Sequence, residues 1–327
     1  MKENYINLIK FELSKAEELP DYNESEEIGM FKIKTANETL NEASLLPIPV
    51  KLWDSFWYEG ELCCLFADSN IGKSILAVQI ADEIAKKKKV IYFDFELSII
   101  QFFLRYRDEN GITYKFPDNF LRAEMNIDSI LTNNIEESII NAIADAALKH
   151  NSNIIIIDNI TYLNSATEKG DIAGKLMIQL TLLKSKYNLS ILVLAHTPKR
   201  SMSKPLTQND LSGSKRLFNF FDSAFAIGKS AKDFNLRYIK QIKVRNGPFT
   251  YDDDNVIIYT INKSNSFLGF EFVGYGKEKE HLRELSDNEI SQEILNVKEL
   301  AKKGMSYRDI AKELGITKSK VGRILHK

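Results

Sequence analysis

The chain has 327 residues, which at about 100–200 residues per domain favours one large domain and a smaller one. Hydrophobic residues make up 44% and charged residues 27%, a composition typical of a globular chain with a core of normal size. The formal net charge of -1 excludes a chain-wide field that would attract a polyanion. The charge is uneven, however: residues 1–50 carry ten acids and five bases, and residues 301–327 carry eight bases and two acids. This asymmetry indicates separate roles for the two ends.

The cysteines and the apolar runs indicate a cytoplasmic protein. Cys63 and Cys64 are adjacent in an apolar run, so on a strand they point to opposite faces and are poorly placed to pair with each other. No histidine lies nearby, and we expect two reduced core residues, as in a reducing cytoplasm. Residues 1–13 are too polar for a signal peptide, and no apolar run approaches the ~18 residues that span a bilayer.

The hydrophobic pattern divides the chain into four parts. Residues 1–45 are polar and acidic, and we expect a short helix over 5–16 within a flexible arm. Residues 46–275 form the main domain, which begins with a Pro-rich extended segment at 46–50. Residues 276–288 form a charged linker, and residues 289–327 form a small all-α domain.

Strands and helices alternate in the first part of the main domain. Strands are predicted at 61–66, 90–95, 154–157 and 190–195, and helices at 73–86, 98–107, 135–150 and 176–187. Such alternation predicts an α/β fold with a mostly parallel central sheet covered on both faces. Shorter strands at 223–227, 236–244, 256–261 and 268–273 are expected to extend the sheet in antiparallel fashion.

A phosphate-binding loop is predicted between the first strand and the first helix. The segment from Ala67 through Asp68, Ser69, Asn70, Ile71, Gly72 and Lys73 to Ser74 follows the P-loop pattern, with alanine in place of the first glycine. Backbone N–H groups and the helix N-terminus cradle phosphates there, Lys73 reaches the β- and γ-phosphates, and Ser74 ligates Mg²⁺. The alternative is a chance Gly-Lys-Ser at the start of a helix. The pattern therefore predicts ATP and Mg²⁺ as cofactors.

Three polar residues at the ends of later strands are candidates for the same site. Asp158 follows a buried strand and is predicted to hold Mg²⁺, the alternative being a capping role. Glu96 is predicted to act as the general base for the attacking water, and otherwise is a surface acid. His196 ends the strand at 190–195 and can hydrogen-bond the γ-phosphate, although a structural role is open.

The motifs at Phe93–Ser98, Ile157–Asn159 and Leu194–Thr197 resemble the RecA-like branch of P-loop ATPases, above all the RepA-like hexameric helicases of plasmids and their DnaB-type relatives. The resemblance covers about residues 46–275 and implies ATP hydrolysis by a ring, with Glu96 as the catalytic glutamate. Asp210–Ser214 is similar to the family's Arg-Gly-Ser-Ser segment, except that Ser212 replaces the arginine, so any role of that arginine here depends on Lys215 or Arg216.

The segment from Lys243 to Pro248 resembles the Lys-x-Arg-Asn-Gly-Pro segment of DnaB-like helicases. The resemblance implies that Lys243 and Arg245 reach the γ-phosphate held by a neighbouring subunit. A cation inserted in this way stabilises the transferring phosphoryl group and makes hydrolysis depend on assembly. The alternative is a solvent-facing strand edge that ends in an Asn-Gly turn.

Two long loops and the C-terminal domain are candidates for DNA binding. The loops at 161–175 and 197–215 would line the channel of such a ring, and Lys199, Arg200 and Lys204 would neutralise the phosphates of single-stranded DNA. The alternative is that these loops are disordered and bind nothing. In the tail, a turn with Gly315 and a Thr317 cap joins two short helices in a helix-turn-helix pattern, similar to the tails of resolvase-like recombinases and to sigma-factor region four. Four residues would face duplex DNA, unless the module binds protein instead: Lys318, Ser319, Lys320 and Arg323.

The sequence therefore predicts an ATP-hydrolysing, DNA-binding motor. The expected form is a homo-oligomeric ring, a hexamer by resemblance, that acts as a RepA-like DNA helicase in the replication or mobilisation of a plasmid or mobile element. The alternative function is a nucleotide-switched DNA-binding regulator or loader that does not unwind DNA.

Overall fold

The computed structural model describes residues 26–29, 31–126, 135–159, 170–198, 200–211, 215–284 and 287–326. The chain divides into two compact units, Met1–Pro49 and Val50–Lys327, and each is described by itself. The helix predicted over residues 5–16 lies outside the described residues, as do Lys199, Ser212 and most of the predicted loop at 161–175.

The first unit contains regular structure that the sequence pattern did not predict. Strands β1 (Glu26–Ile28) and β2 (Phe31–Ile33) pair in antiparallel fashion, and helix α2 (Ala36–Ser44) follows. Thr35 and Glu38 form a capping box at the start of α2, in which each side chain accepts a hydrogen bond from the other residue's backbone N–H. The local signal for this helix was therefore present, although α2 has no buried residues.

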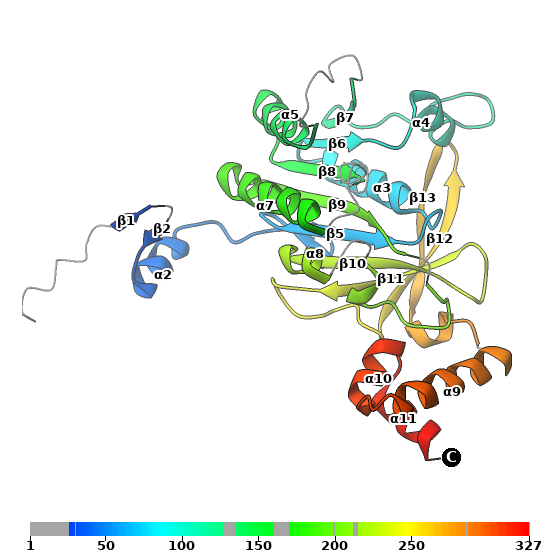
Figure 1. The fold of residues 1–327 in the computed structure, drawn as a ribbon. Helices are drawn as coiled ribbons and strands as arrows, with labels where there is room; N and C mark the ends of the chain where they lie inside the picture. The colour runs from blue at the N-terminus through cyan, green and yellow to red at the C-terminus, as the bar shows by residue number, and fades with distance from the viewer. Residues whose placement is uncertain are drawn as a thin grey trace, which may run out of the picture. The chain divides into compact units, whose positions relative to one another are not determined.

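A nine-stranded sheet forms the centre of the second unit (Figure 1). Its order is β13-β12-β11-β10-β5-β9-β8-β6-β7, in which β10 to β7 run parallel and β11 to β13 are antiparallel. The predicted α/β fold with a mostly parallel central sheet is confirmed. The strands are β5 (Leu62–Ala67), β6 (Val90–Asp94), β7 (Phe120–Glu124), β8 (Ile154–Asp158), β9 (Ser190–His196), β10 (Ser223–Lys229), β11 (Leu236–Lys243), β12 (Val256–Ser264) and β13 (Phe267–Gly276).

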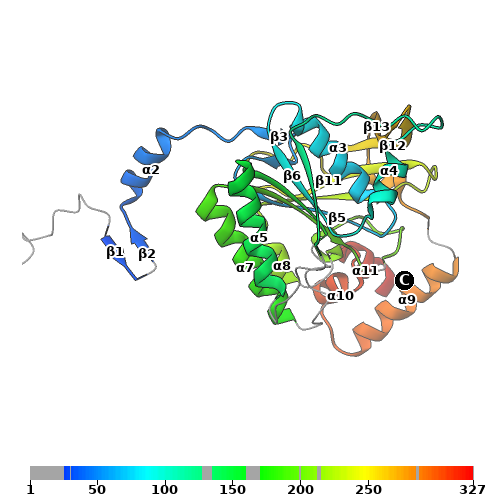
Figure 2. The same cartoon turned by 90° about the horizontal axis from the view of Figure 1, so that it is seen from above.

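Two hydrophobic clusters cover the two faces of this sheet. Helices α5 (Ile135–His150), α7 (Gly170–Tyr187) and α8 (Lys215–Phe220) pack on one face (Figure 2). Helix α3 (Lys73–Ala85) and the hairpin of β3 (Lys51–Trp53) and β4 (Trp57–Tyr58) pack on the other. Cys63 and Cys64 are both free and buried, and they belong to different clusters because successive strand residues point to opposite faces.

The sequence pattern missed several elements of the main domain, among them β3, β4, β7 and α8. Strand β7 lies at the edge of the sheet, and its side chains are only partly buried or exposed, so it lacks the continuous apolar run of a central strand. Helix α4 (Ile99–Arg105) was expected. Helix α8 was not, because its six residues are too few to show a helical periodicity.

The segment predicted as a charged linker begins as part of the packed domain. Glu278 and His281 are each 1% exposed and belong to a 3₁₀ helix that follows β13. Glu278 Oε2 accepts a hydrogen bond from Lys240 Nζ at 2.6 Å, and Oε1 accepts one from Leu206 N at 2.7 Å. The charge of Glu278 is therefore paired inside the protein, which the sequence alone does not reveal.

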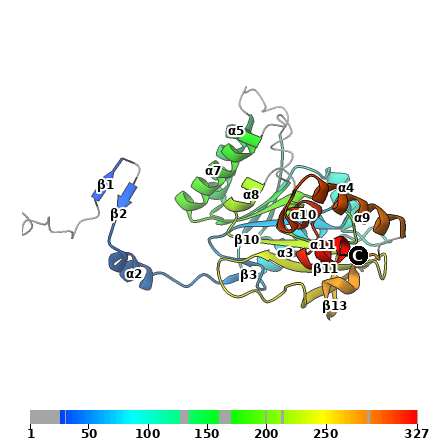
Figure 3. The same ribbon diagram turned by 60° about the horizontal axis from the view of Figure 1, so that its bottom comes forward.

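The predicted helical C-terminal region is present (Figure 3). Helices α9 (Asp287–Lys302), α10 (Tyr307–Leu314) and α11 (Lys318–Leu325) share a small core centred on Val297, Ile310 and Val321. Gly315 adopts a left-handed φ of 60° at the end of α10, and the Thr317 side chain accepts a hydrogen bond from the Lys320 N–H at the start of α11. Among the described residues, no helix has the length and apolarity needed to cross a membrane.

Candidate nucleotide-binding site

The predicted P-loop joins β5 to α3 and has a backbone that only certain residues allow. Asn70 has a φ of 61°, and Gly72 caps α3 with a φ of 112°. A Cβ at position 72 would lie 2.8 Å from the Ile261 side chain and 3.1 Å from Phe270, so both conformation and space require glycine. The buried Arg237 guanidinium donates to the Ile71 carbonyl at 2.9 Å and fixes the loop from behind.

A cavity of about 450 Å³ opens beside this loop. It lies at the carboxyl ends of the parallel strands, which is where open α/β sheets bind their ligands. The residues around it come from the P-loop, from the first turn of α3, from the ends of β6 and β9, and from α4 and β12. They are Ser69, Asn70, Gly72, Lys73, Ser74, Ile75, Glu96, Arg105, His196 and Ile261.

Lys73 is the buried cation of the cavity. Its Nζ donates to the carbonyls of Ala67 at 2.8 Å and Asp68 at 3.1 Å, and lies 3.0 Å from His196 Nδ1. Burial lowers the pKa of the Lys73 ammonium, while the nearby carboxylates of Asp158 and Glu96 oppose this change. A phosphate group would supply the negative charge that this buried ammonium lacks.

Asp158 ends β8 in a fully buried position. Burial raises the pKa of its carboxyl to about 6, although hydrogen bonds from the Ser74 and Tyr92 side chains partly offset that effect. Oδ2 accepts from the Tyr92 hydroxyl at 2.5 Å, whereas Oδ1 makes no hydrogen bond of normal geometry within the described residues. A buried carboxylate beside the Ser74 hydroxyl fits Mg²⁺, which takes one or two protein oxygens and completes its shell with phosphate and water. The described residues contain no group of three or more His, Cys, Asp or Glu side chains that could hold a metal ion.

Glu96 and His196 meet at the mouth of the cavity. Glu96 Oε1 lies 3.2 Å from His196 Nε2 and also accepts a hydrogen bond from the Asn159 amide. His196 Nδ1 lies 3.0 Å from the Lys73 ammonium, and His196 Nε2 also lies 2.9 Å from the Asn159 amide nitrogen, so the ring connects the P-loop lysine to both Glu96 and Asn159. This contact with His196 holds the pKa of Glu96 below its ordinary value, so the carboxylate is ionised, as a general base requires.

Asp94 is close to Glu96 in sequence but has a different environment. Its Oδ1 accepts from the backbone N–H groups of Glu96 at 3.1 Å and Leu97 at 2.9 Å. Its Oδ2 pairs with Arg122 of β7 at 2.9 Å. With both oxygens bound, Asp94 shapes the turn that presents Glu96 and is not free to activate water. Arg122 was not predicted, because β7 was not.

Arg105 is a second cavity residue that sequence reasoning missed. It is the last residue of α4 and lines the cavity, and its Nη1 is buried without a hydrogen-bond partner among the described residues. It also contributes to the lowered pKa of Glu96. A guanidinium in this position can contact a phosphate or the face of a base. The only sequence signal was one arginine at the end of a short predicted helix.

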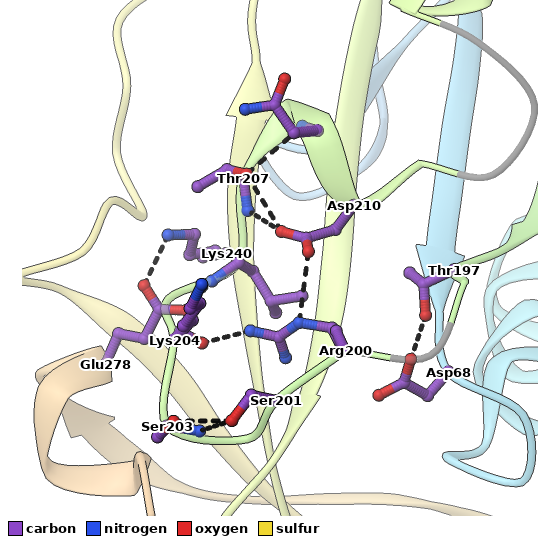
Figure 4. A network of polar contacts seen from close by, with 12 residues as sticks. Asp68, Thr197, Arg200, Ser201, Ser203, Lys204, Thr207, Asp210, Lys240 and Glu278 are labelled. Atoms are coloured by element: carbon purple, nitrogen blue, oxygen red, sulfur yellow. Dashed lines mark hydrogen bonds and ion pairs between the residues drawn. The ribbon is translucent and has the colours of Figure 1, made fainter. Parts of the chain in front are cut away.

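The loop after β9 is folded against its own domain (Figure 4). Thr197 donates to the Asp68 carboxylate of the P-loop. Arg200 lies 3.4 Å from Asp210 and donates to the Lys204 carbonyl, and its side chain is 8% exposed. Lys204 Nζ donates to the carbonyl of Leu314 at the end of α10. Both cations are thus engaged within the chain in this structure, and their contact with DNA stays a prediction.

Lys243 and Arg245 lie at the opposite edge of the sheet from the P-loop. Strand β11 is antiparallel to β10, and Lys243 pairs with Ala224 near the beginning of β10. Arg245 Nη1 lies 2.7 Å from Asp222 Oδ1, and Lys243 Nζ donates to the Phe218 carbonyl at 3.1 Å. The structure therefore does not bring these two cations to the nucleotide cavity of their own chain.

The predicted DNA-facing residues lie on α11. Lys318, Ser319 and Arg323 are exposed. Lys320 is half-buried and pairs with Glu293 of α9 at 2.6 Å, so part of its charge is already compensated.

The chain is similar to a known protein family and to a solved structure. Residues 31–202, slightly more than half of the chain, match a family described as AAA domain. Among solved structures, the KaiC-like protein PH0186 from the hyperthermophilic archaeon Pyrococcus horikoshii OT3 is similar at 12% identity, with a TM-score of 0.46, over 66% of this chain and 91% of that chain. No curated protein matches this sequence.

Replacing Glu96 with Gln should lower the rate of ATP hydrolysis about 10²–10⁴-fold, because the base is lost while the phosphate contacts remain. Nucleotide affinity, measured with a fluorescent ATP analogue, should not change. The matched variant is Asp94→Asn, which breaks the pair with Arg122 and should mainly reduce stability in a thermal melt. A silent Glu96→Gln beside an inactive but stable Asp94→Asn would mean that the acids have been assigned the wrong way round.

Proposed function

Because the chain belongs to the AAA domain family, we propose that it is an ATP-dependent DNA-binding motor, of the kind that RepA-like helicases form as rings. In this proposal, the motor is a RecA-like P-loop ATPase. The observation that carries the proposal is the convergence of Lys73, Glu96 and His196 on one cavity beside the P-loop.

The arrangement of these side chains accounts for ATP hydrolysis. The backbone N–H groups of the P-loop and the start of α3 bind the phosphates, and Lys73 contacts the terminal ones. Bound Mg²⁺, held by Ser74 and Asp158, would neutralise phosphate charge. Glu96 takes the proton of the attacking water. His196 lies between Lys73 and Glu96, so loss of the γ-phosphate changes the contacts of both residues at once.

DNA binding is assigned to the C-terminal helices. Residues 301–327 carry eight bases and two acids, and exposed Lys318 and Arg323 lie on α11. The Gly315 turn and the Thr317 cap support a helix-turn-helix in which α11 enters the major groove. Phosphate contacts by such cations give affinity, and the helix face gives any preference for sequence.

Assembly into a homo-oligomeric ring, a hexamer in the resembling family, is proposed from Lys243 and Arg245. They lie at the edge of the sheet opposite their own cavity, so any nucleotide that they contact belongs to a neighbouring subunit. A trans cation stabilises charge in the transition state and couples hydrolysis to assembly.

A second function is favoured by the loop after β9. In a helicase, this loop would hold cations for single-stranded DNA, yet Arg200 and Lys204 are engaged within the chain. A nucleotide-switched regulator or loader would use the C-terminal helices alone and would not unwind DNA.

Strand displacement separates these two functions. With ATP and a forked duplex, a helicase should release the labelled strand, and single-stranded DNA should stimulate its ATPase. Lys73→Ala should do neither, because the side chain that binds the terminal phosphates is gone. A regulator would hydrolyse ATP slowly and change its duplex affinity with the nucleotide bound, while releasing no strand.

Ending the chain at residue 284 should leave basal ATPase unchanged but weaken duplex binding, measured at one fixed salt concentration by fluorescence anisotropy. In the full chain, a Lys318→Ala, Arg323→Ala variant should lower the salt slope by about 0.9 for each phosphate that the protein no longer neutralises. Lys320→Ala serves as the matched control and should have a smaller effect, because Lys320 already pairs with Glu293. Unchanged duplex affinity in the shortened chain would point to a protein-binding module.

Mixing Arg245→Ala with Glu96→Gln subunits tests the trans contact. Each variant alone should hydrolyse ATP poorly. In mixed rings, some interfaces join an intact Glu96 to an intact Arg245 of the other subunit, and those should recover part of the activity. Rings shown to be mixed but without recovery would contradict the trans role, and a chain that stays monomeric with nucleotide and DNA would exclude it.

A further inference from the structure

Tyr92 makes a buried contact that the mechanism above does not use. It is the third residue of β6, and its hydroxyl donates to Asp158 Oδ2 at 2.5 Å. Both side chains are fully buried. The phenol therefore binds the carboxylate of the predicted Mg²⁺ ligand from the side of the core.

The strand register explains why this residue reaches Asp158. Strands β6 and β8 pair in parallel with Asp94 opposite Asp158, and Tyr92 lies two residues before Asp94 on the same face of the sheet. Two residues of strand span about 6.6 Å, a distance that a tyrosine side chain covers but a serine or aspartate does not. The ring is held by Phe120, with centroids 6.0 Å apart at an interplanar angle of 61°. Position and direction of the hydroxyl are thus fixed by packing.

The contact makes the two oxygens of Asp158 unequal. Oδ2 is held by Tyr92 on the core side, while Oδ1 has no hydrogen bond of normal geometry within the described residues. We propose that Tyr92 is a positioning residue that fixes the Asp158 carboxylate so that Oδ1 is presented to the Mg²⁺ of the bound nucleotide. The inference rests on the proposed ATPase function and adds a residue to its metal site.

A simpler explanation is that any buried tyrosine hydroxyl needs a partner. Tyr106 argues against it, because that residue is 3% exposed and its hydroxyl is buried with no hydrogen-bond partner among the described residues. Its ring packs against Phe102 and Phe116 in an aromatic cluster close to Tyr92. The fold therefore tolerates an unpaired tyrosine hydroxyl in this region, so burial alone does not account for the pairing of Tyr92 with Asp158.

The test compares Tyr92→Phe and Tyr106→Phe with the wild-type full chain. Binding of a fluorescent ADP analogue is measured first in EDTA and then across a Mg²⁺ titration. Affinity without Mg²⁺ should be equal in all three proteins. Residues that orient a metal ligand change metal affinity about 10–100-fold, so the Mg²⁺ concentration at half-maximal tightening should rise at least tenfold in Tyr92→Phe alone. Equal Mg²⁺ midpoints in the two variants would overturn the proposal.

A second variant keeps the test valid if Tyr92→Phe folds poorly. Asp158→Asn removes the buried charge. In the double variant with Tyr92→Phe, there is then no carboxylate that has lost its hydrogen bond. The Mg²⁺ titration of Asp158→Asn should be unchanged by the additional Tyr92→Phe. A further tenfold shift in the double variant would mean that Tyr92 acts by a route other than Asp158.

The outcomes also separate this inference from the proposed function. If the wild type binds no nucleotide, the ATPase proposal itself fails, whatever the variants do. If the wild type binds nucleotide with Mg²⁺ dependence and Tyr92→Phe matches it, only the positioning role is refuted.

Discussion

The parallel register of the central strands is the constraint on which the site depends. Hydrogen bonding between β5 and β9 places Ala67 opposite His196, and pairing of β6 with β8 places Asp94 opposite Asp158. Since parallel strands all end at one edge, residues that are far apart in sequence lie close together there. The reversal of direction at β11 has the opposite effect and sends Lys243 to the other edge.

The acids at that edge differ in their burial and in their bound partners. Asp158 is fully buried, and its pKa is raised to about 6, so a nearby cation stabilises its ionised form. Glu96 is exposed at the cavity mouth, and the contact with His196 lowers its pKa. Asp94 is saturated by Arg122 and two backbone N–H groups. The three acids therefore differ in burial and in bound partners rather than in residue type, and these differences support the separate roles proposed for them.

The sequence predicts those parts of the fold whose signal is local. Strands β5, β6 and β8 and the Gly72-Lys73-Ser74 motif can be recognised from neighbouring residues alone. The polar residues at the ends of these strands could therefore be predicted as site residues. Strand β7 was missed because half-exposed edge residues carry no continuous apolar run. For Arg200 and Lys204, a charge in a loop does not reveal whether it faces water or an internal partner such as Asp210. A contact between two strands, such as that of Tyr92 with Asp158, can be predicted only when the register of the strands is known.

Unsatisfied polar atoms at the cavity indicate how nucleotide binding relates to stability. Arg105 Nη1 and Asp158 Oδ1 are both buried without partners among the described residues, and a buried polar atom without a partner costs about 1–3 kcal/mol. One is a donor beside the cavity and the other an acceptor next to Ser74. A nucleotide with its metal supplies both missing partners, a phosphate or base acceptor and a cation. Ligand binding would satisfy these two atoms and stabilise the folded chain, because a ligand that binds only the folded state shifts the unfolding equilibrium.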